Sequence, residues 1–156
     1  MHVALAADHH GVRLKRQLAG WLTSRGHTVT DAGGHDPEEV VDYPPLCAAV
    51  SRMVASGTAD LAIVMGGSGQ GEVIACNKVR GVRAGLAYSR FAVRISRGNN
   101  DANVMVIPAK VVSDTDAIAL VELWLDTPFN GGRHQDRVDQ ITALEVGQIT
   151  ALEPDR

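Results

Sequence analysis

The chain has 156 residues, the length of one ordinary domain, which is enough to bury a hydrophobic core without disulfides or a structural metal. Hydrophobic residues make up 45% of it, charged residues 21%, and the formal net charge is −3, which excludes disorder and a global electrostatic attraction to nucleic acid or membranes. Any anionic ligand must therefore be held by a local cluster of residues.

Short β-type runs alternate with helical patterns along the chain. Strands are predicted at residues 3–7, 27–33, 61–65, 82–88 and 103–108, and helices at 12–26, 43–57, 71–79, 89–98, 114–125 and 133–145. The alternation is typical of parallel strands joined by crossover helices. We therefore predict a single α/β domain, residues 1–147, with a Rossmann-like sheet of five parallel strands and a C-terminal helix. The remaining residues, 148–156, are predicted to form a separate tail.

Cysteine usage and the N-terminal residues bear on the compartment. Cys47 and Cys76 lack CxxC spacing and lie within apolar helical patterns, so we interpret them as small buried hydrophobes in a reducing cytoplasm. The chain opens with MHVALAADHHG, which has no basic lead, and no apolar run reaches the roughly 18 residues that a membrane span needs. We expect a soluble cytoplasmic protein.

In a doubly wound sheet, ligands bind outside the carboxyl ends of the strands. The loops at these ends are predicted to be 8–10, 31–43, 66–72, 88–89 and 108–110. The stretch SRGNND, which includes Asn99 and Asn100, follows a helix and precedes a strand, so it belongs to the opposite edge of the sheet. If these asparagines are functional, a partner subunit supplies them.

The loop GGSGQGE, Gly66 to Glu72, crowds glycines ahead of an acid. It matches neither the P-loop nor the dinucleotide GxGxxG spacing. Its backbone N–H groups are suited to stabilising an oxyanion that develops during a reaction, and Glu72 would then be the base that creates this anion. A second interpretation is that Glu72 is only a favourable acid in the first turn of a helix.

Two further stretches also have both a functional and a purely structural interpretation. Asp8 at a strand end is either a functional carboxylate or a cap for the next helix. Arg133 and Arg137 lie four residues apart on one helical face with His134 beside them, which suits a phosphate clamp but is also typical of a solvated basic face.

Taken together, five separated stretches resemble the family of type B ribose-5-phosphate isomerases and galactose-6-phosphate isomerase subunits. They are ADHHG (7–11), DYP (42–44), GGSGQGEVIACNK (66–78), NND (99–101) and GGRHQDRV (131–138). The resemblance runs from about Val3 to Glu145. It implies a three-layer α/β/α sandwich and a homodimer or dimer of dimers with active sites shared between subunits.

The resemblance also implies an enzyme that interconverts a phosphorylated aldose and its ketose through a cis-enediolate, without metal or organic cofactor. Glu72 takes the role of base, because the cysteine that serves another branch of the family is replaced by Gly66. Cys76 is an alternative thiolate base. Ser68 matches a proton relay and Asp8 a group near the reacting hydroxyls. The oxyanion loop is Gly67, Gly69 and Gly71, and the substrate-binding residues are His9, Tyr43, Asn99, Asn100, Lys110, Arg133, His134 and Arg137.

Two positions depart from the family pattern. Asn99 stands where family members acting on ribose 5-phosphate have a ring-opening histidine, and an amide does not titrate in the useful range. Lys110 stands where an arginine often binds phosphate, so the charge is kept but the bidentate fork is lost. Ribose 5-phosphate is the first expectation for the substrate. A tetrose 4-phosphate, which needs no ring opening, a hexose 6-phosphate and a non-catalytic phosphosugar-binding role are the alternatives.

Overall fold

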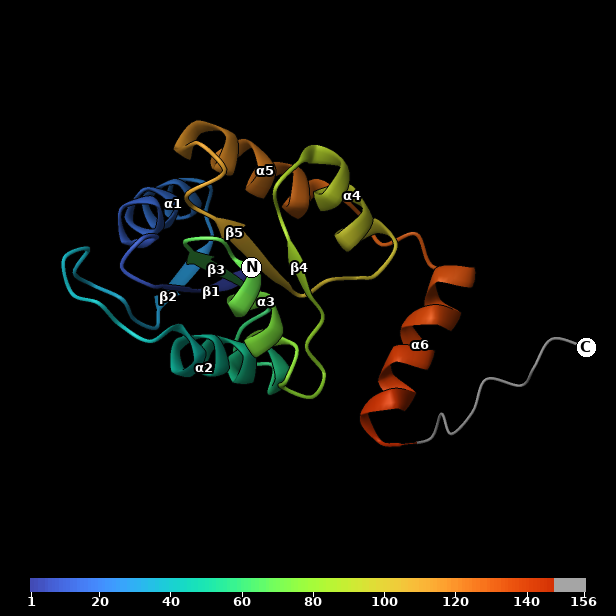
Figure 1. The fold of residues 1–156 in the computed structure, drawn as a ribbon. Coiled ribbons are helices and arrows are strands. Elements are labelled where there is room, and N and C mark those ends of the chain that lie inside the picture. The colour runs from blue at the N-terminus through green and yellow to red at the C-terminus, as the bar shows by residue number, and fades with distance from the viewer. Residues whose placement is uncertain (148–156) are drawn as a thin grey trace, which may run out of the picture.

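The computed structural model describes residues 1–147, so the predicted tail, 148–156, lies outside the described residues. The strands are β1 (His2–Ala7), β2 (Thr28–Asp31), β3 (Leu61–Gly66), β4 (Ala84–Leu86) and β5 (Val104–Pro108). The helices are α1 (Val12–Ser24), α2 (Tyr43–Ala55), α3 (Gln70–Cys76), α4 (Arg90–Gly98), α5 (Asp114–Asp126) and α6 (Arg133–Glu145). Strands and helices alternate as predicted (Figure 1).

The five strands form one parallel sheet in the order β2-β1-β3-β5-β4. The order reverses between β1 and β3, because the chain adds β2 on one side of β1 and then crosses to the other side. Ligands of open α/β sheets bind outside the carboxyl ends of the strands at such a switch point. The loops that follow β1 and β3 are the ones that contain Asp8 and Gly66 to Glu72.

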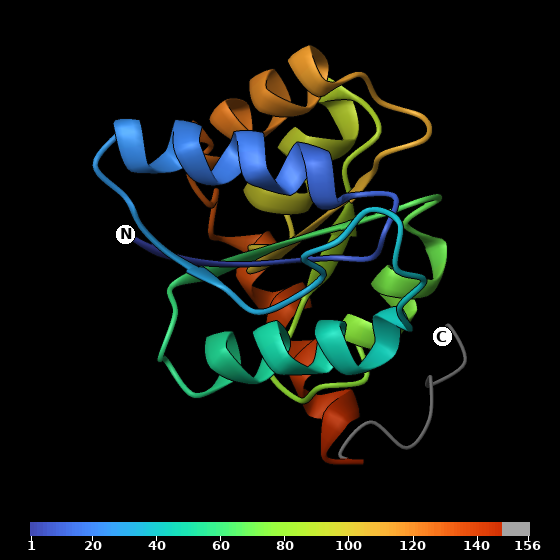
Figure 2. The ribbon, with the colours of Figure 1, turned by 90° about the vertical axis from the view of Figure 1, so that its left-hand side faces the viewer.

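Helices cover both faces of the sheet, which confirms the predicted α/β/α sandwich. Helices α1, α4 and α5 pack on one face and α2 and α3 on the other (Figure 2). The central strands β1, β3 and β5 are buried almost throughout, which explains their continuous apolar sequences. Alternate residues of each strand face the two helical layers, so the sheet lies between two hydrophobic cores.

The edge strands and one helix are shorter than their sequence patterns. Strand β2 ends at Asp31, whose Oδ1 accepts a hydrogen bond from the Gly33 N–H at 3.1 Å and turns the chain away from the sheet. Helix α3 ends at Cys76 because the side chain of Asn77 donates to the carbonyl of Val73 at 3.0 Å and exchanges two hydrogen bonds with the backbone of Ala84. One asparagine therefore ends the helix and fixes the start of β4.

Cys47 and Cys76 are buried and form no disulfide with each other, as their positions in the sequence predicted. A hydrogen bond to Cys76 and burial raise the pKa of the Cys47 thiol, which therefore remains protonated. The two side chains help to pack α2 and α3 against the sheet. Their role in this structure is that of small core residues.

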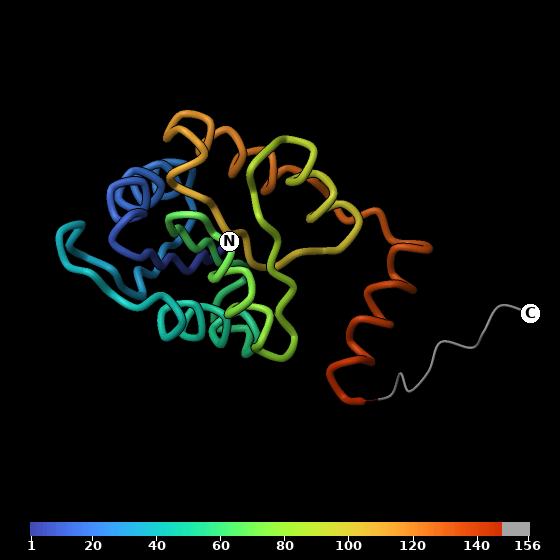
Figure 3. The backbone as a smooth tube through the Cα atoms, viewed as in Figure 1, coloured from blue at the N-terminus to red at the C-terminus, as the bar shows by residue number. Residues whose placement is uncertain are grey.

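Helix α6 stands apart from the sandwich (Figures 1 and 3). At its end, the carboxylate of Glu145 accepts the Gly81 N–H at 2.9 and 3.0 Å, and Arg80 donates to the Glu145 carbonyl at 3.3 Å. Val138 is buried, but Ile141 and Leu144 remain 41% and 59% exposed. The helix therefore presents apolar side chains to its surroundings. No helix in residues 1–147 is long and apolar enough to cross a membrane.

Candidate functional site

A cavity of about 360 Å³ opens at the carboxyl ends of β1 and β3, at the switch point of the sheet. Its lining residues are Asp8, His10, Tyr43, Gly67, Ser68, Gly71, Glu72 and Lys110. They come from four separate segments of the chain. With the exception of His10, all of them were predicted site residues, and the fold brings all three predicted catalytic residues, Asp8, Ser68 and Glu72, into one cavity.

Asp8 joins the loop after β1 to the glycine loop after β3. Its Oδ1 accepts the N–H groups of His10 at 2.8 Å and Gly11 at 3.2 Å, and its Oδ2 accepts the N–H of Gly67 at 3.4 Å. The carboxylate is buried. Asp8 therefore fixes the turn ahead of α1 and forms a wall of the cavity; it does not cap the helix, because the N-cap of α1 is Gly11 and has no side-chain cap hydrogen bond.

Glu72 lies in the first turn of α3 and is only 4% exposed. Its carboxylate occupies the space in front of the Gly66 backbone, where any Cβ at position 66 would overlap it. Burial raises the pKa of this carboxyl; the hydrogen bond from its own backbone N–H opposes the shift, the negative charge of Asp8 adds to it and His10 opposes it. Glu72 is therefore an acid held out of water beside a second acid, which is typical of a functional carboxylate.

The glycine loop approaches its neighbours more closely than side chains would allow. Gly69 has φ +74°, and a Cβ there would lie 2.5 Å from Cδ1 of Leu86. At Gly71 a Cβ would overlap the hydroxyl end of Tyr43, whose ring therefore lies directly against the backbone of the loop. These contacts leave no room for a side chain at Gly69 or Gly71, so this part of the loop requires glycine.

Ser68 and Lys110 lie at the exposed rim of the cavity. The Ser68 Oγ accepts the N–H of Gln70 at 3.3 Å, and its hydroxyl proton is left for a ligand. The N–H of Lys110 donates to the Gly67 carbonyl at 3.0 Å, and that of Ala109 to the Gly66 carbonyl at 2.8 Å. The end of β5 is thus tied to the glycine loop, which places a cation beside the cavity.

His9 and His10 lie in contact, with ring centroids 3.9 Å apart. His10 lines the cavity and was not among the predicted site residues; its place beside Asp8 at a strand end was the available signal. His9 has a buried Nδ1 with no hydrogen-bond partner among residues 1–147. Asp8, His9 and His10 offer ligand atoms within 4.8 Å of one another, but both oxygens of Asp8 already bind backbone N–H groups, so we assign no metal to them.

The other predicted residues lie away from this cavity. Asn99 and Asn100 follow α4, at the amino-terminal edge of the sheet, as the sequence order predicted. Arg133, His134 and Arg137 lie in α6, which begins after α5 has returned to that same edge. None of these five lines the cavity of its own chain. The described chain alone therefore lacks the predicted phosphate clamp in its cavity.

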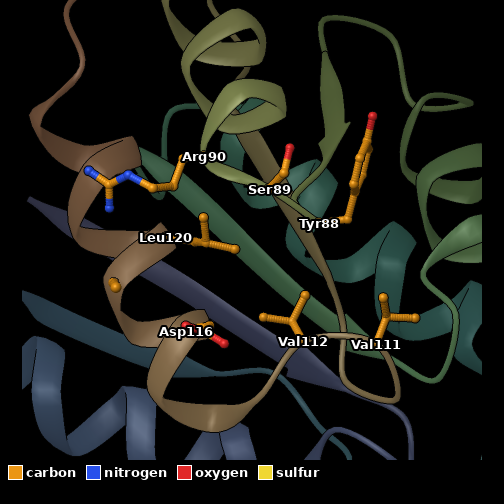
Figure 4. A pocket seen from close by; sticks show the side chains of 8 residues that line it. Tyr88, Ser89, Arg90, Val111, Val112, Asp116 and Leu120 are labelled. Carbon is orange, nitrogen blue, oxygen red and sulfur yellow. The ribbon is translucent and has the colours of Figure 1, made fainter.

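A second cavity, of about 240 Å³, lies between the start of α4 and α5 (Figure 4). Val111, Val112 and Leu120 form its apolar side, and Arg90 extends away from the other labelled side chains. Two of its polar groups are used locally: Ser89 Oγ accepts the Ala92 N–H at 3.2 Å, and Asp116 accepts the Ser113 hydroxyl proton at 2.7 Å. This cavity has no acid and base directed at a common point.

Known proteins resemble this chain over nearly its whole length. The family model described as Ribose/Galactose Isomerase matches residues 3–141. Ribose-5-phosphate isomerase B of Escherichia coli (strain K12) is 38% identical over 143 residues, which cover 92% of this chain and 95% of the relative.

Solved structures agree with this match. The structure of Clostridium thermocellum ribose-5-phosphate isomerase B has a TM-score of 0.92 at 41% identity, over 94% of this chain and 99% of that chain. Ribose-5-phosphate isomerase B from Mycoplasma genitalium, with bound ribulose-5-phosphate, has a TM-score of 0.87 at 34% identity, over 93% of this chain and 96% of that chain. The chain therefore belongs to the Ribose/Galactose Isomerase family and is an isomerase that interconverts aldoses and ketoses.

Proposed function

We propose that this enzyme interconverts a phosphorylated aldose and its ketose, with ribose 5-phosphate and ribulose 5-phosphate as the first pair to test. The observation that carries the proposal is the buried carboxylate of Glu72, which faces a glycine loop in the same cavity as Asp8 and Ser68. A base beside backbone N–H groups is the arrangement needed to form an enediolate and stabilise it.

In the proposed mechanism, Glu72 removes the proton from C2 of the open-chain aldose, and the electron pair moves onto the carbonyl oxygen to form a cis-enediolate. The backbone N–H groups of Gly69 and Gly71, together with that of Gly67 once it leaves its 3.4 Å hydrogen bond to Asp8, stabilise this anion. Ser68 transfers a proton from the C2 oxygen to the C1 oxygen. Glu72 then returns its proton to C1, so the product is a ketose with the same atoms and charge. The mechanism uses no metal or organic cofactor.

Asp8 and Tyr43 complete the proposed sugar site within one chain, and Lys110 at its rim adds a positive charge. We assign His9, which lies against His10, to the phosphate of the substrate. In this proposal Asn99, Asn100, Arg133, His134 and Arg137 reach the cavity of a partner subunit in a homodimer, or in a dimer of dimers. The exposed apolar side chains of α6 support such contact, because a helix of this kind gains stability when a second surface covers it. We place the enzyme in the cytoplasm, without nucleic acid or membrane partners.

Asn99 determines which sugar is favoured. A furanose must open before its C2 proton can be removed, and the amide of Asn99 is not a general acid. Ribose 5-phosphate turnover would then depend on spontaneous opening or on another group, such as His10. A tetrose 4-phosphate is the second candidate because phosphate blocks the hydroxyl that would close its ring. A hexose 6-phosphate is the third.

The test is turnover of the purified enzyme with ribose 5-phosphate and erythrose 4-phosphate side by side, following ketose formation. The Glu72→Gln variant is the matched control, because it keeps the shape of the side chain and removes its basicity. We expect turnover of at least one sugar by the wild type and a loss of about 10² or more in the variant. Turnover that persists in the Glu72→Gln variant would contradict the proposed base.

A further inference from the structure

Asn130 connects the two segments whose predicted functional groups lie outside the cavity of their own chain. Its side-chain Nδ2 donates to Oδ1 of Asn99 at 3.1 Å, and its backbone N–H donates to the carbonyl of Gly98 at 2.8 Å. These two hydrogen bonds join the connection between α5 and α6 to the end of α4. Asn99 and the start of α6 are therefore held together as one unit.

Gly98 makes this connection sterically possible. It is buried, and a Cβ at its position would lie only 3.1 Å from Nδ2 of Asn130 and 3.5 Å from Cγ2 of Thr127. The amide of Asn130 thus rests on the bare backbone at the end of α4. Beyond Asn130 come Gly131 and Gly132, with φ of +62° and +56°, so Asn130 is the last side chain before the turn into α6.

A second contact holds the other side of the same loop. Arg83 donates to the carbonyl of Asn100 at 2.9 Å and to that of Asp101 at 2.8 Å, and its guanidinium pairs with the Asp101 carboxylate at 3.1 Å. Asp101 has φ +45°, a conformation that a non-glycine residue rarely adopts, and Arg97 pairs with its carboxylate as well. The backbone of the loop is therefore fixed, whereas the side chains of Asn99 and Asn100 are not held by these contacts.

The hydrogen bond from Asn130 holds the side chain of Asn99. Because Oδ1 of Asn99 accepts from Asn130 at an exposed position, the N–H groups of Asn99 Nδ2 remain available to another partner. Asn99 consequently presents a hydrogen-bond donor to whatever lies opposite. A ligand group that it contacts must be an acceptor, such as a carbonyl, alkoxide or phosphate oxygen.

We propose that Asn130 is a positioning residue that orients the amide of Asn99 toward an oxygen of the substrate in the partner's site. The proposal rests on the proposed function, because Asn99 meets substrate only if the active site is shared. It assigns to Asn130 a part in substrate selection, through the direction of one amide, without contact between Asn130 and the substrate.

The test is a double-mutant cycle in which kcat/KM is measured. Asn130→Asp and Asn130→Ala are each made in the wild type and in the Asn99→Ala variant. In Asn130→Asp the new carboxylate accepts rather than donates, so the Asn99 amide turns and presents its oxygen to the substrate. We expect kcat/KM to fall about tenfold in Asn130→Asp and about fivefold in Asn130→Ala. In the Asn99→Ala background neither change should lower kcat/KM further. Equal losses in both backgrounds, or no loss in either, would overturn the proposal.

A second measurement does not depend on turnover. The side-chain amide ¹H–¹⁵N signals of Asn99 should move in Asn130→Ala while the melting temperature and the backbone signals of α4 stay in place. Unmoved Asn99 side-chain signals would refute the orienting hydrogen bond. If the wild type isomerises no phosphosugar, the proposed function fails; if it is active but the losses are equal in both backgrounds, only the role of Asn130 fails.

Discussion

At the scale of the residue, Glu72 explains why an acid follows a loop built for anions. Its carboxylate does not repel a bound anion from the rim, because it lies buried over Gly66 at the inner end of the loop. In the proposed mechanism, a base in that position takes a proton from carbon while the N–H groups of the loop stabilise the charge that forms on oxygen. The acid and the loop would thus act on different atoms of one substrate.

The raised pKa of Glu72 predicts a pH dependence of both activity and stability. The base must be ionised, so the acid limb of kcat/KM should have its midpoint above the ordinary value of 4.5 for a glutamate. Ionising this buried carboxyl also costs the folded chain stability. That cost is absent below pH 4.5, where both folded and unfolded chains are protonated, and grows as the pH rises through the folded pKa.

Glu72→Gln should therefore raise the melting temperature at neutral pH, and the difference from the wild type should shrink toward pH 4. Thermal unfolding of both proteins across this range measures it. A variant that is less stable than the wild type at pH 7 would refute the burial argument, since glutamine has the same shape without the charge.

Gly66→Ala tests the placement of the Glu72 carboxylate. The new Cβ would overlap that carboxylate, so the side chain of Glu72 must move away from its position. We expect kcat to fall by a factor of about 10², because a catalytic group would be misplaced while the fold is retained. Gly20→Ala is the matched control, because nothing lies within 4 Å of a Cβ there; it should keep full activity. Full activity in Gly66→Ala would show that Glu72 acts from another position.

The sequence predicted much of the candidate site because ligands of open α/β sheets bind at the carboxyl ends of the strands. Asp8, Ser68 and Glu72 directly follow two central strands, so parallel pairing brings them together whatever the details of packing. Asn130 was not predicted, since its significance depends on a hydrogen bond to a residue 31 positions away. Such a contact leaves no periodic or local mark in the sequence.

At the scale of the element, Lys15 fixes α1 to the loop that leaves β2. Its side chain is only 1% exposed, and Nζ pairs with the Asp31 carboxylate and donates to the Gly33 carbonyl at 2.8 Å. The sequence pattern offered no reason to bury a lysine, because the helical stripe around it is apolar. The contact ties the loop between β2 and α2, which leads to Tyr43, to the edge of the sheet.

Lys15→Met should lower the free energy of unfolding by about 1–3 kcal/mol, because it removes the cation paired with Asp31 and one of the two N–H donors to the Gly33 carbonyl, the other being the Ala7 N–H at 3.3 Å. Urea unfolding measures the change. Arg13→Met on the same helix removes the same charge from a pair that is 78% and 83% exposed, and it should cost less than about 1 kcal/mol. Similar losses in both variants would refute a specific role for the buried lysine.

The elements themselves were predictable to different degrees. The strands β1, β3 and β5 are apolar on both faces, so their runs are unambiguous. The edge strands β2 and β4 were predicted too long, because their ends depend on side chains such as Asp31 and Asn77 that bind neighbouring backbone. Hydrophobic pattern alone does not contain that information.

At the scale of the whole molecule, the proposed catalytic carboxylate and the predicted phosphate clamp lie at opposite edges of the sheet. Glu72 lines the cavity at the carboxyl ends, and Arg133 and Arg137 lie in α6, which stands apart from the sandwich (Figure 3). One chain cannot use both sets on one substrate without a large movement of α6. In our account a second copy of the chain supplies the clamp, and each site contains residues of both copies.

Subunit complementation tests this central claim most directly. Glu72→Gln and Arg137→Ala, each nearly inactive alone, are unfolded together and refolded as a mixture, and isomerase turnover is measured against the separately refolded parents. In a mixed dimer with shared sites, one site carries both changes and the other carries neither. We therefore predict recovery of about a quarter of the wild-type turnover from random pairing. Turnover equal to the mean of the two parents would contradict a shared site. It would mean that Glu72 and Arg137 of one chain act in the same active site.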